Sequence, residues 1–193
     1  MITKPIGKIP EILIYKVPQK QTVVGYTYHK CGFPTLYRMA DTKTGQLVGE
    51  MLGDVVVHDK SIHQTFYPIN EPYKTFYIAE LKMDERGQGY GSKFIQFAKN
   101  LSKQFGGEGR VHLVASRLYD RERPPHVFYK KLGFVSNNKF MNDYLDDCIK
   151  SKTPLESELA CNLNMYLPIE GEIYTNNHKS KFQTFINFLK RFL

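Results

Sequence analysis

The amino-acid sequence predicts one α/β domain built on a mixed β-sheet. The chain has 193 residues, of which 41% are hydrophobic, enough for one sizeable core and short for two independent domains. Strand and helix patterns alternate along a sequence that is otherwise mainly β in character. No internal repeat, low-complexity tract or Gly/Ser-rich linker interrupts this order. We therefore expect residues 1–193 to form a single domain.

Strands dominate the first half of the predicted domain. β-forming runs occupy Leu36–Ala40, Gln46–Leu52, Val55–His58 and Thr75–Met83. Between the first two runs, Asp41 and Gly45 suit a tight hairpin connection. The last run is the strongest strand candidate, because it alternates and is rich in β-forming residues.

Helices and strands alternate in the second half. A helix follows residues 86–91 and ends at Gly106 and Gly107, and its apolar stripe consists of Phe94, Ala98, Leu101 and Phe105. The later patterns predict a strand over Arg110–Ser116, a helix over His126–Leu132 opened by Pro124 and Pro125, a strand over Phe134–Ser136, a helix over Lys139–Lys150 and a strand over Glu158–Leu167.

Residues 179–193 predict a basic amphipathic C-terminal helix, with apolar residues at helical spacing from Phe182 to Phe192. Such a helix can lie on an anionic membrane or RNA, form a homodimer contact, or dock on the protein's own sheet, which we favour. It carries four basic and no acidic residues, so it holds four of the eight net positive charges of the chain.

The net charge of +8 favours anionic partners such as polyphosphorylated cofactors, nucleic acid or acidic membrane surfaces. The charge outside the tail is only +4, which a polyphosphorylated cofactor is sufficient to explain. Nucleic acid is therefore not required as a partner. The chain also lacks the interleaved aromatic and basic motifs of a nucleic-acid-binding module.

Cysteine usage and the apolar runs predict a cytoplasmic protein. Cys31, Cys148 and Cys161 are odd in number, lie far apart and form no C-x-x-C pair. The N-terminus is broken by Pro5 and Pro10 and shows no secretory signal, and no apolar run is long enough to span a membrane. The six scattered histidines do not predict a metal site.

The glycine cluster Arg86–Gly91 is the segment that indicates a functional site. Three alternating glycines let the backbone turn sharply and come close to a ligand. Between a strand and a helix, their N–H groups lie at the positive end of the helix dipole, which favours an anion. A P-loop is excluded because Ser92 precedes Lys93, and a Rossmann fingerprint by the G-x-G-x-G spacing in mid-chain. An acyl-CoA pyrophosphate loop is the third interpretation.

Two blocks resemble the GNAT superfamily of N-acetyltransferases. Arg86–Gly91 resembles its [QR]-x-x-G-x-[GA] signature, and Phe128–Phe134 resembles its Y-x-K-x-G-F block at the expected distance downstream. Both blocks occur in order with a strand between them. The strand–turn–strand around Gly45 is similar to the second and third strands of the family. The resemblance covers about residues 36–167.

The resemblance implies six or seven mixed, mostly antiparallel strands that splay apart near the middle, with acetyl-CoA as co-substrate in the gap. By analogy, the backbone of Leu81, Lys82 and Met83 at the end of the fourth strand pairs with the pantetheine arm. The pyrophosphate is held by the loop amides and the serine that follows them, at Arg86, Gly87, Gln88, Gly89, Gly91 and Ser92.

Tyr129 matches the family tyrosine that lies near the CoA sulfur and acts as general acid. Acetyl transfer to an amine also needs a neutral amine and a stabilised oxyanion, and the family supplies the oxyanion donor from the backbone. A phenol with a pKa near 10 can protonate a thiolate only when held in contact with it. The alternative is that Tyr129 is an interior aromatic of its helix.

Glu80 is the candidate general base. It is the only acid inside Thr75–Met83, and strict alternation places it on the same face as Phe76 and Ile78, where a buried carboxylate would be costly. The alternative is an edge-facing or salt-bridged glutamate, and Glu50 is a weaker candidate for the base.

The chain departs from the family pattern at one position. Many members carry an asparagine seven residues before the tyrosine, and this chain has Glu122 there. Arg117, Arg121 and Arg123 either supply the missing contact by gripping a CoA phosphate or form a solvated loop.

The sequence thus predicts an acetyl-CoA-dependent N-acetyltransferase that acts on a primary amine of a small molecule or a protein, by direct attack in a ternary complex. The alternatives are a catalytically weak acyl-CoA-binding interaction module and an RNA-directed acetyltransferase that acts on aminoacyl-tRNA.

Overall fold

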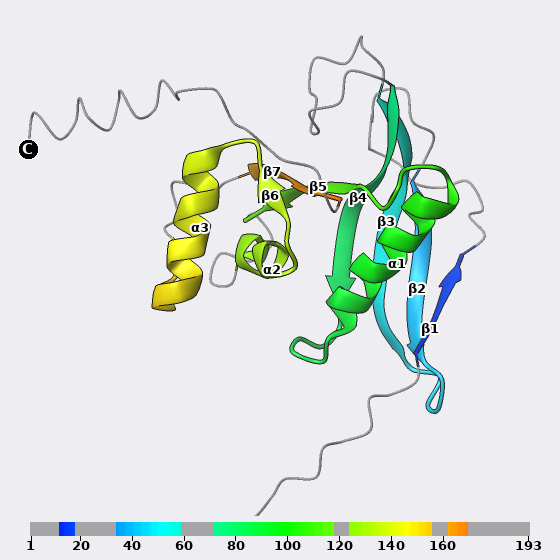
Figure 1. The fold of residues 1–193 in the computed structure, drawn as a ribbon. Coiled ribbons are helices and arrows are strands. Elements are labelled where there is room, and N and C mark those ends of the chain that lie inside the picture. Colours follow the sequence, from blue (N-terminus) through cyan, green and yellow to red (C-terminus); the bar gives the residue numbers. More distant parts are fainter. Residues whose placement is uncertain (1–11, 18–33, 59–71, 118–123, 156–161, 170–193) are drawn as a thin grey trace, which may run out of the picture.

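A computed structural model describes residues 12–17, 34–58, 72–117, 124–155 and 162–169 of the chain. Seven strands and three helices lie in this part of the chain (Figure 1). They are β1 (Ile12–Lys16), β2 (Thr35–Asp41), β3 (Leu47–His58), β4 (Tyr73–Met83), α1 (Tyr90–Gln104), β5 (Val111–Ser116), α2 (Pro125–Lys131), β6 (Val135–Ser136), α3 (Lys139–Ser151) and β7 (Asn162–Leu167).

The seven strands form one sheet in the order β1-β2-β3-β4-β5-β7-β6. Every neighbouring pair is antiparallel except β4 and β5, which run parallel. The parallel pair is possible because α1 connects the two strands and carries the chain back along the sheet. The predicted mixed, mostly antiparallel sheet of six to seven strands is confirmed.

Two of the differences from the predicted strands lie at β1 and β3. β1 was not predicted, and it pairs with β2 along its whole length. The runs 46–52 and 55–58 form the single strand β3, whose pairing with β4 continues across Gly53 with a one-residue shift in register. A Cβ on Gly53 would lie 2.6 Å from the carbonyl oxygen of Tyr77, so only glycine lets the two strands approach there. The predicted helix at 179–193 lies outside the described residues.

The core of the described domain lies between the sheet and its helices. Phe94 and Ala98 of α1 are fully buried in the same apolar cluster as Phe76 of β4 and Leu113 of β5. The aromatic ring of Tyr37 on β2 contacts the rings of Phe76 and Phe97, which ties α1 to this face of the sheet. Tyr129 of α2 belongs to the same cluster, so α1 and α2 cover one face.

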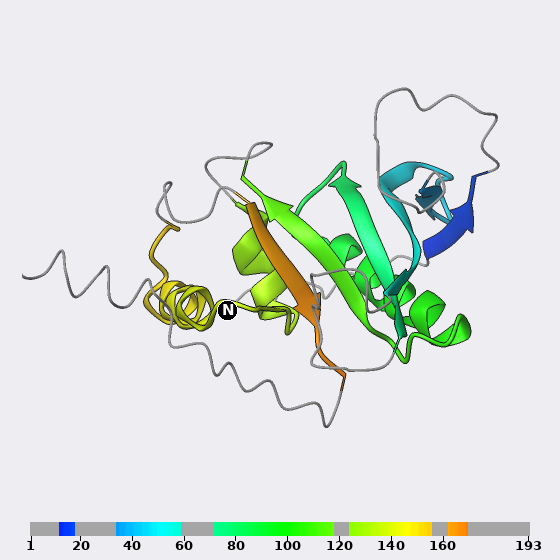
Figure 2. The ribbon, with the colours of Figure 1, turned by 90° about the horizontal axis from the view of Figure 1, so that it is seen from above.

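β4 and β5 are paired over only three residues and then diverge (Figure 2). Their last partners are Ile78 and Leu113. The next residue of β4, Ala79, is skipped in the pairing with β3, where Leu52 faces Glu80 and Gly53 faces Ile78. Such a bulge bends a strand and increases its twist. The bulge therefore coincides with the point at which β4 leaves β5.

Candidate active site

The loop between β4 and α1 presents its backbone to solvent. Residues 86–89 are exposed, and the φ angles of Gly87 and Gly89 are +79° and +77°. These angles favour glycine, and a Cβ at either position would have no atom within 4 Å. The glycines are therefore required by the backbone conformation, and the space beside them is open.

The glycine loop leads directly into the first turn of α1. Gly89 is the N-cap, no side chain in the described part of the chain caps this end, and its first turn holds no acidic residue. The N–H groups of Tyr90, Gly91 and Ser92 have no partner within the helix by its geometry. With the helix dipole, they provide an environment that stabilises a bound anion.

Gly91 lies inside α1, where it contacts α2. A Cβ on Gly91 would lie 2.8 Å from Cζ of Phe128. The side chain of Ser92 in the same turn is exposed. The structure thus gives Gly91 a packing role that the sequence motif alone did not reveal.

Leu81, Lys82 and Met83 form the end of β4 beyond its divergence from β5. They pair with Met51, Glu50 and Gly49 of β3. On the other side, the register with β5 has already ended at Ile78. The predicted pantetheine-pairing segment therefore lies where β4 has only one strand partner among the described residues.

Tyr129 is buried on α2, with 8% of its surface exposed. Its ring centroid lies 5.1 Å from that of Phe128 and 5.5 Å from that of Phe134. Burial raises the pKa of the Tyr129 phenol, so its hydroxyl stays protonated at neutral pH. Because Phe128 touches Gly91, Tyr129 lies one residue from the contact between α2 and the first turn of α1.

The sequence placed Glu80 on the wrong face of the sheet. Phe76 and Ile78 are buried, but after the bulge at Ala79 it is Leu81 and Met83 that pack against the core. A one-residue slip exchanges the two faces of a strand. Glu80 is consequently exposed on the opposite face, and the argument from a costly buried carboxylate fails.

The other polar candidates have defined partners. Arg38 Nε donates to Glu50 Oε1 at 2.8 Å, in a cross-strand pair between β2 and β3. Arg117 donates to the carbonyl of Leu155 at 3.0 Å, which ties the end of β5 to the segment after α3. Glu122, Arg121 and Arg123 lie outside the described residues.

The parallel β4–β5 pair, the divergence at the bulge and the glycine loop at the start of α1 together match the architecture implied by the resemblance. The chain has a GNAT-like fold. Within this GNAT-like domain, the described residues contain no group of three or more His, Cys, Asp or Glu side chains that could hold a metal ion. No helix in the described part is long and apolar enough to cross a membrane.

Comparisons with known proteins find similar structures but no similar sequences. No protein-family model matches the sequence, and no curated protein matches it. A bacterial toxin structure covers 94% of this chain and 96% of its own, with 15% identity and a TM-score of 0.45. Arabidopsis thaliana Naa50 in complex with the bisubstrate analogue CoA-Ac-MVNAL covers 69% and 72%, with 15% identity and a TM-score of 0.42.

A third similar structure is described as histone acetyltransferase HPA2 and related acetyltransferase from Corynebacterium glutamicum. It covers 75% of this chain and 67% of its own, with 18% identity and a TM-score of 0.41.

Proposed function

We propose that the protein is an acetyl-CoA-dependent N-acetyltransferase that transfers an acetyl group to a primary amine of a small molecule or a protein. The observation that carries this proposal is the coincidence of the β4 bulge with the end of the β4–β5 pairing, next to a glycine loop that opens α1. One strand with an open side and one helix N-terminus without a side-chain cap suit an elongated ligand that ends in phosphates.

Acetyl-CoA fits the described loop on chemical grounds. The exposed backbone of Arg86, Gly87, Gln88 and Gly89 and the first-turn N–H groups of Gly91 and Ser92 are donors for a pyrophosphate. The segment Leu81–Met83 offers backbone groups on the side that β5 has left, for the amides of the pantetheine arm. When bound, acetyl-CoA supplies the activated thioester.

Tyr129 is the proposed general acid. In the reaction, the amine nitrogen forms a bond to the thioester carbon, the carbon–sulfur bond breaks, and the leaving thiolate takes a proton. Burial keeps the Tyr129 phenol protonated at neutral pH, so its hydroxyl can donate to the leaving thiolate when the two are in contact.

Glu80 is the proposed general base that removes a proton from the amine, directly or through water. Its exposure on the face opposite α1 leaves it accessible to an incoming acceptor. Glu80→Gln should lower kcat with little effect on acetyl-CoA affinity, and Glu108→Gln, an exposed glutamate paired with Arg110, is the control. Unchanged turnover in Glu80→Gln would assign the base to another group.

The first test is thermal unfolding of the full chain with acetyl-CoA. A ligand that binds only the native state stabilises it by about 2.7 kcal/mol at a hundred times its Kd, so the Tm should rise. An unchanged Tm at saturating acetyl-CoA would contradict the proposed cofactor. A raised Tm without any acetylated product from an amine panel would indicate an acyl-CoA-binding module instead.

A further inference from the structure

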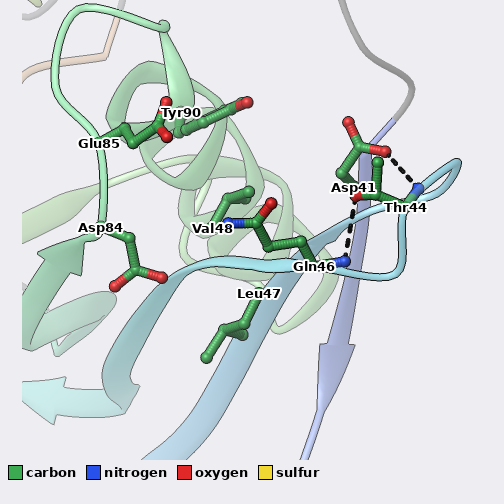
Figure 3. Close-up of a pocket in the computed structure, with 8 residues that line it drawn as sticks. All are labelled: Asp41, Thr44, Gln46, Leu47, Val48, Asp84, Glu85 and Tyr90. Carbon is green, nitrogen blue, oxygen red and sulfur yellow. Dashed lines mark hydrogen bonds between the residues drawn. The ribbon is translucent and has the colours of Figure 1, made fainter.

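A small acidic pocket lies on the hairpin side of the β4–α1 loop (Figure 3). The β2–β3 hairpin forms one wall, and Asp84, Glu85 and Tyr90 form the other. Its volume of about 120 Å³ is roughly ten times the ~10–15 Å³ that one water needs. The two walls are fixed to each other, because the N–H of Asp84 donates to the carbonyl of Val48 at 3.2 Å.

Three carboxylates line this pocket, in a chain whose net charge is +8. Within the part of the chain that the structure describes, the side chains of Asp84 and Glu85 form no hydrogen bond or ion pair. Asp41 Oδ1 accepts from the backbone N–H groups of Lys43 and Thr44 at 2.8 and 2.9 Å. These bonds lower the pKa of Asp41, so this carboxylate is ionised at neutral pH.

Tyr90 provides a separate indication that the pocket binds a ligand. Only 8% of this residue is exposed, and its hydroxyl points into the pocket between Glu85 and Asp41 (Figure 3). No residue in the described ranges hydrogen-bonds this hydroxyl. The ring of Tyr90 is buried while its hydroxyl opens onto the pocket, so a polar group of a ligand in the pocket can hydrogen-bond it.

The arrangement suits an organic cation better than a metal ion. The described acidic residues are not close enough together to form a metal-binding group of three. Leu47, Val48 and the ring of Tyr90 add apolar wall to the carboxylates. Methylene groups can pack on such a wall while ammonium groups reach the acids, and an ammonium can also lie over the aromatic face.

The geometry points to a binding site for a small aliphatic polyamine, held by Asp84 and Glu85 and hydrogen-bonded by Tyr90. The site lies at the end of β4, five residues from the bulge at Ala79, which corresponds to about 16 Å of extended strand. It borders the proposed pyrophosphate loop, because Glu85 precedes Arg86 and Tyr90 opens α1, but it uses the side chains of Glu85 and Tyr90 and not the backbone N–H groups of the loop.

Isothermal titration of the full chain with spermidine, at low salt and without acetyl-CoA, tests this site. We expect saturable binding, and at least a tenfold weaker Kd in the double variant Asp84→Asn/Glu85→Gln. Tyr90→Phe keeps the ring and should weaken binding severalfold without lowering the Tm. The control is Asp143→Asn/Asp147→Asn on α3, which removes two exposed carboxylates and the same charge and should leave the Kd unchanged.

Three results would overturn the proposal. One is equal binding by the chain and the double variant at residues 84 and 85, and another is an equal loss in the α3 control, which would indicate nonspecific charge attraction. The third is displacement of spermidine by Mg²⁺ at a tenth of its concentration, which would make the pocket a metal site. A separate titration with acetyl-CoA keeps failure here distinct from failure of the proposed function.

Discussion

Gly91 of α1 lies directly against the ring of Phe128 of α2, so close that a Cβ on the glycine would be 2.8 Å from Phe128 Cζ. This contact joins the helix that follows β4 to the helix that follows β5, although β4 and β5 have already diverged. Tyr129 is therefore one residue along α2 from a contact with the first turn of α1. The Gly91–Phe128 contact thus joins the two blocks, Arg86–Gly91 and Phe128–Phe134, that resemble the family motifs.

Gly91→Ala should destabilise the protein by about 1–3 kcal/mol, because the added methyl group overpacks against Phe128. Urea unfolding measures the loss. Adding Phe128→Leu, which removes the end of the ring, should restore part of it, so the double variant should be more stable than the sum of the two single losses predicts. Strictly additive losses would show that the two residues do not interact.

Gly89→Gln should abolish acetyl-CoA binding, because a side chain would fill the space that the backbone leaves open and strain a φ of +77°. Gly106→Gln is the matched control. Gly106 has a φ of +80° with open space beside it, at the other end of α1, so its variant carries similar strain without touching the loop. If both variants bind acetyl-CoA alike in a calorimetric titration, the loop is not the phosphate site.

Tyr129→Phe should reduce kcat by about 10²–10⁴-fold, the typical contribution of a general acid, while acetyl-CoA affinity stays unchanged. Tyr37→Phe is the control, since Tyr37 is equally buried in the core but lies on β2. Steady-state kinetics and acetyl-CoA titration separate the two effects. Parallel losses of turnover and affinity would make Tyr129 a packing residue.

Stability should fall as the pH drops below about 6.5. Burial, with the charge of His58 as a smaller cause, lowers the pKa of His112 to about 3, and burial and then Arg117 lower that of His126 to about 4. The unfolded chain therefore binds protons on these histidines near pH 6.5, whereas the folded chain does not. As the pH falls from 6.5 to the folded-state pKa of a histidine, that histidine lowers the free energy of unfolding by about 1.4 kcal/mol per pH unit.

Urea unfolding at pH 7, 6 and 5 measures this dependence. His126→Gln removes one of the two groups. The free energy of unfolding should therefore change less steeply with pH than in the unchanged chain, by the contribution of about one proton. Identical slopes for the two proteins would show that His126 is not held neutral in the fold.

Local patterns predicted the elements that position the candidate site. The strand Thr75–Met83, the helix after the glycine loop and the helix opened by the prolines were all found, because each has its own periodicity and end signals. The faces of β4 could not be predicted beyond Ile78. A bulge such as that at Ala79 arises from pairing with β3, and its one-residue shift moved Glu80 to the opposite face.

The acidic pocket could not be predicted from the sequence either. Asp41 and Gln46 come from a hairpin about forty residues before Asp84, and only the antiparallel β3–β4 ladder brings them together. In the sequence, Asp84 and Glu85 form only a short connection between a strand and a glycine loop. The only sequence feature that points to the pocket is the pair of adjacent acids Asp84 and Glu85, shortly before the helix that begins at Tyr90.

The most direct test of the central claim is mass spectrometry of products after incubation of the full chain with acetyl-CoA and a panel of amines. The panel should contain small amines, lysine-containing peptides and free peptide N-termini, with an aminoacyl-tRNA as a separate arm. We predict that a small-molecule or peptide amine gains one acetyl group, with equal release of CoA thiol, and that Tyr129→Phe suppresses both. Absence of acetylated amine from every arm, with acetyl-CoA demonstrably bound, would contradict this prediction.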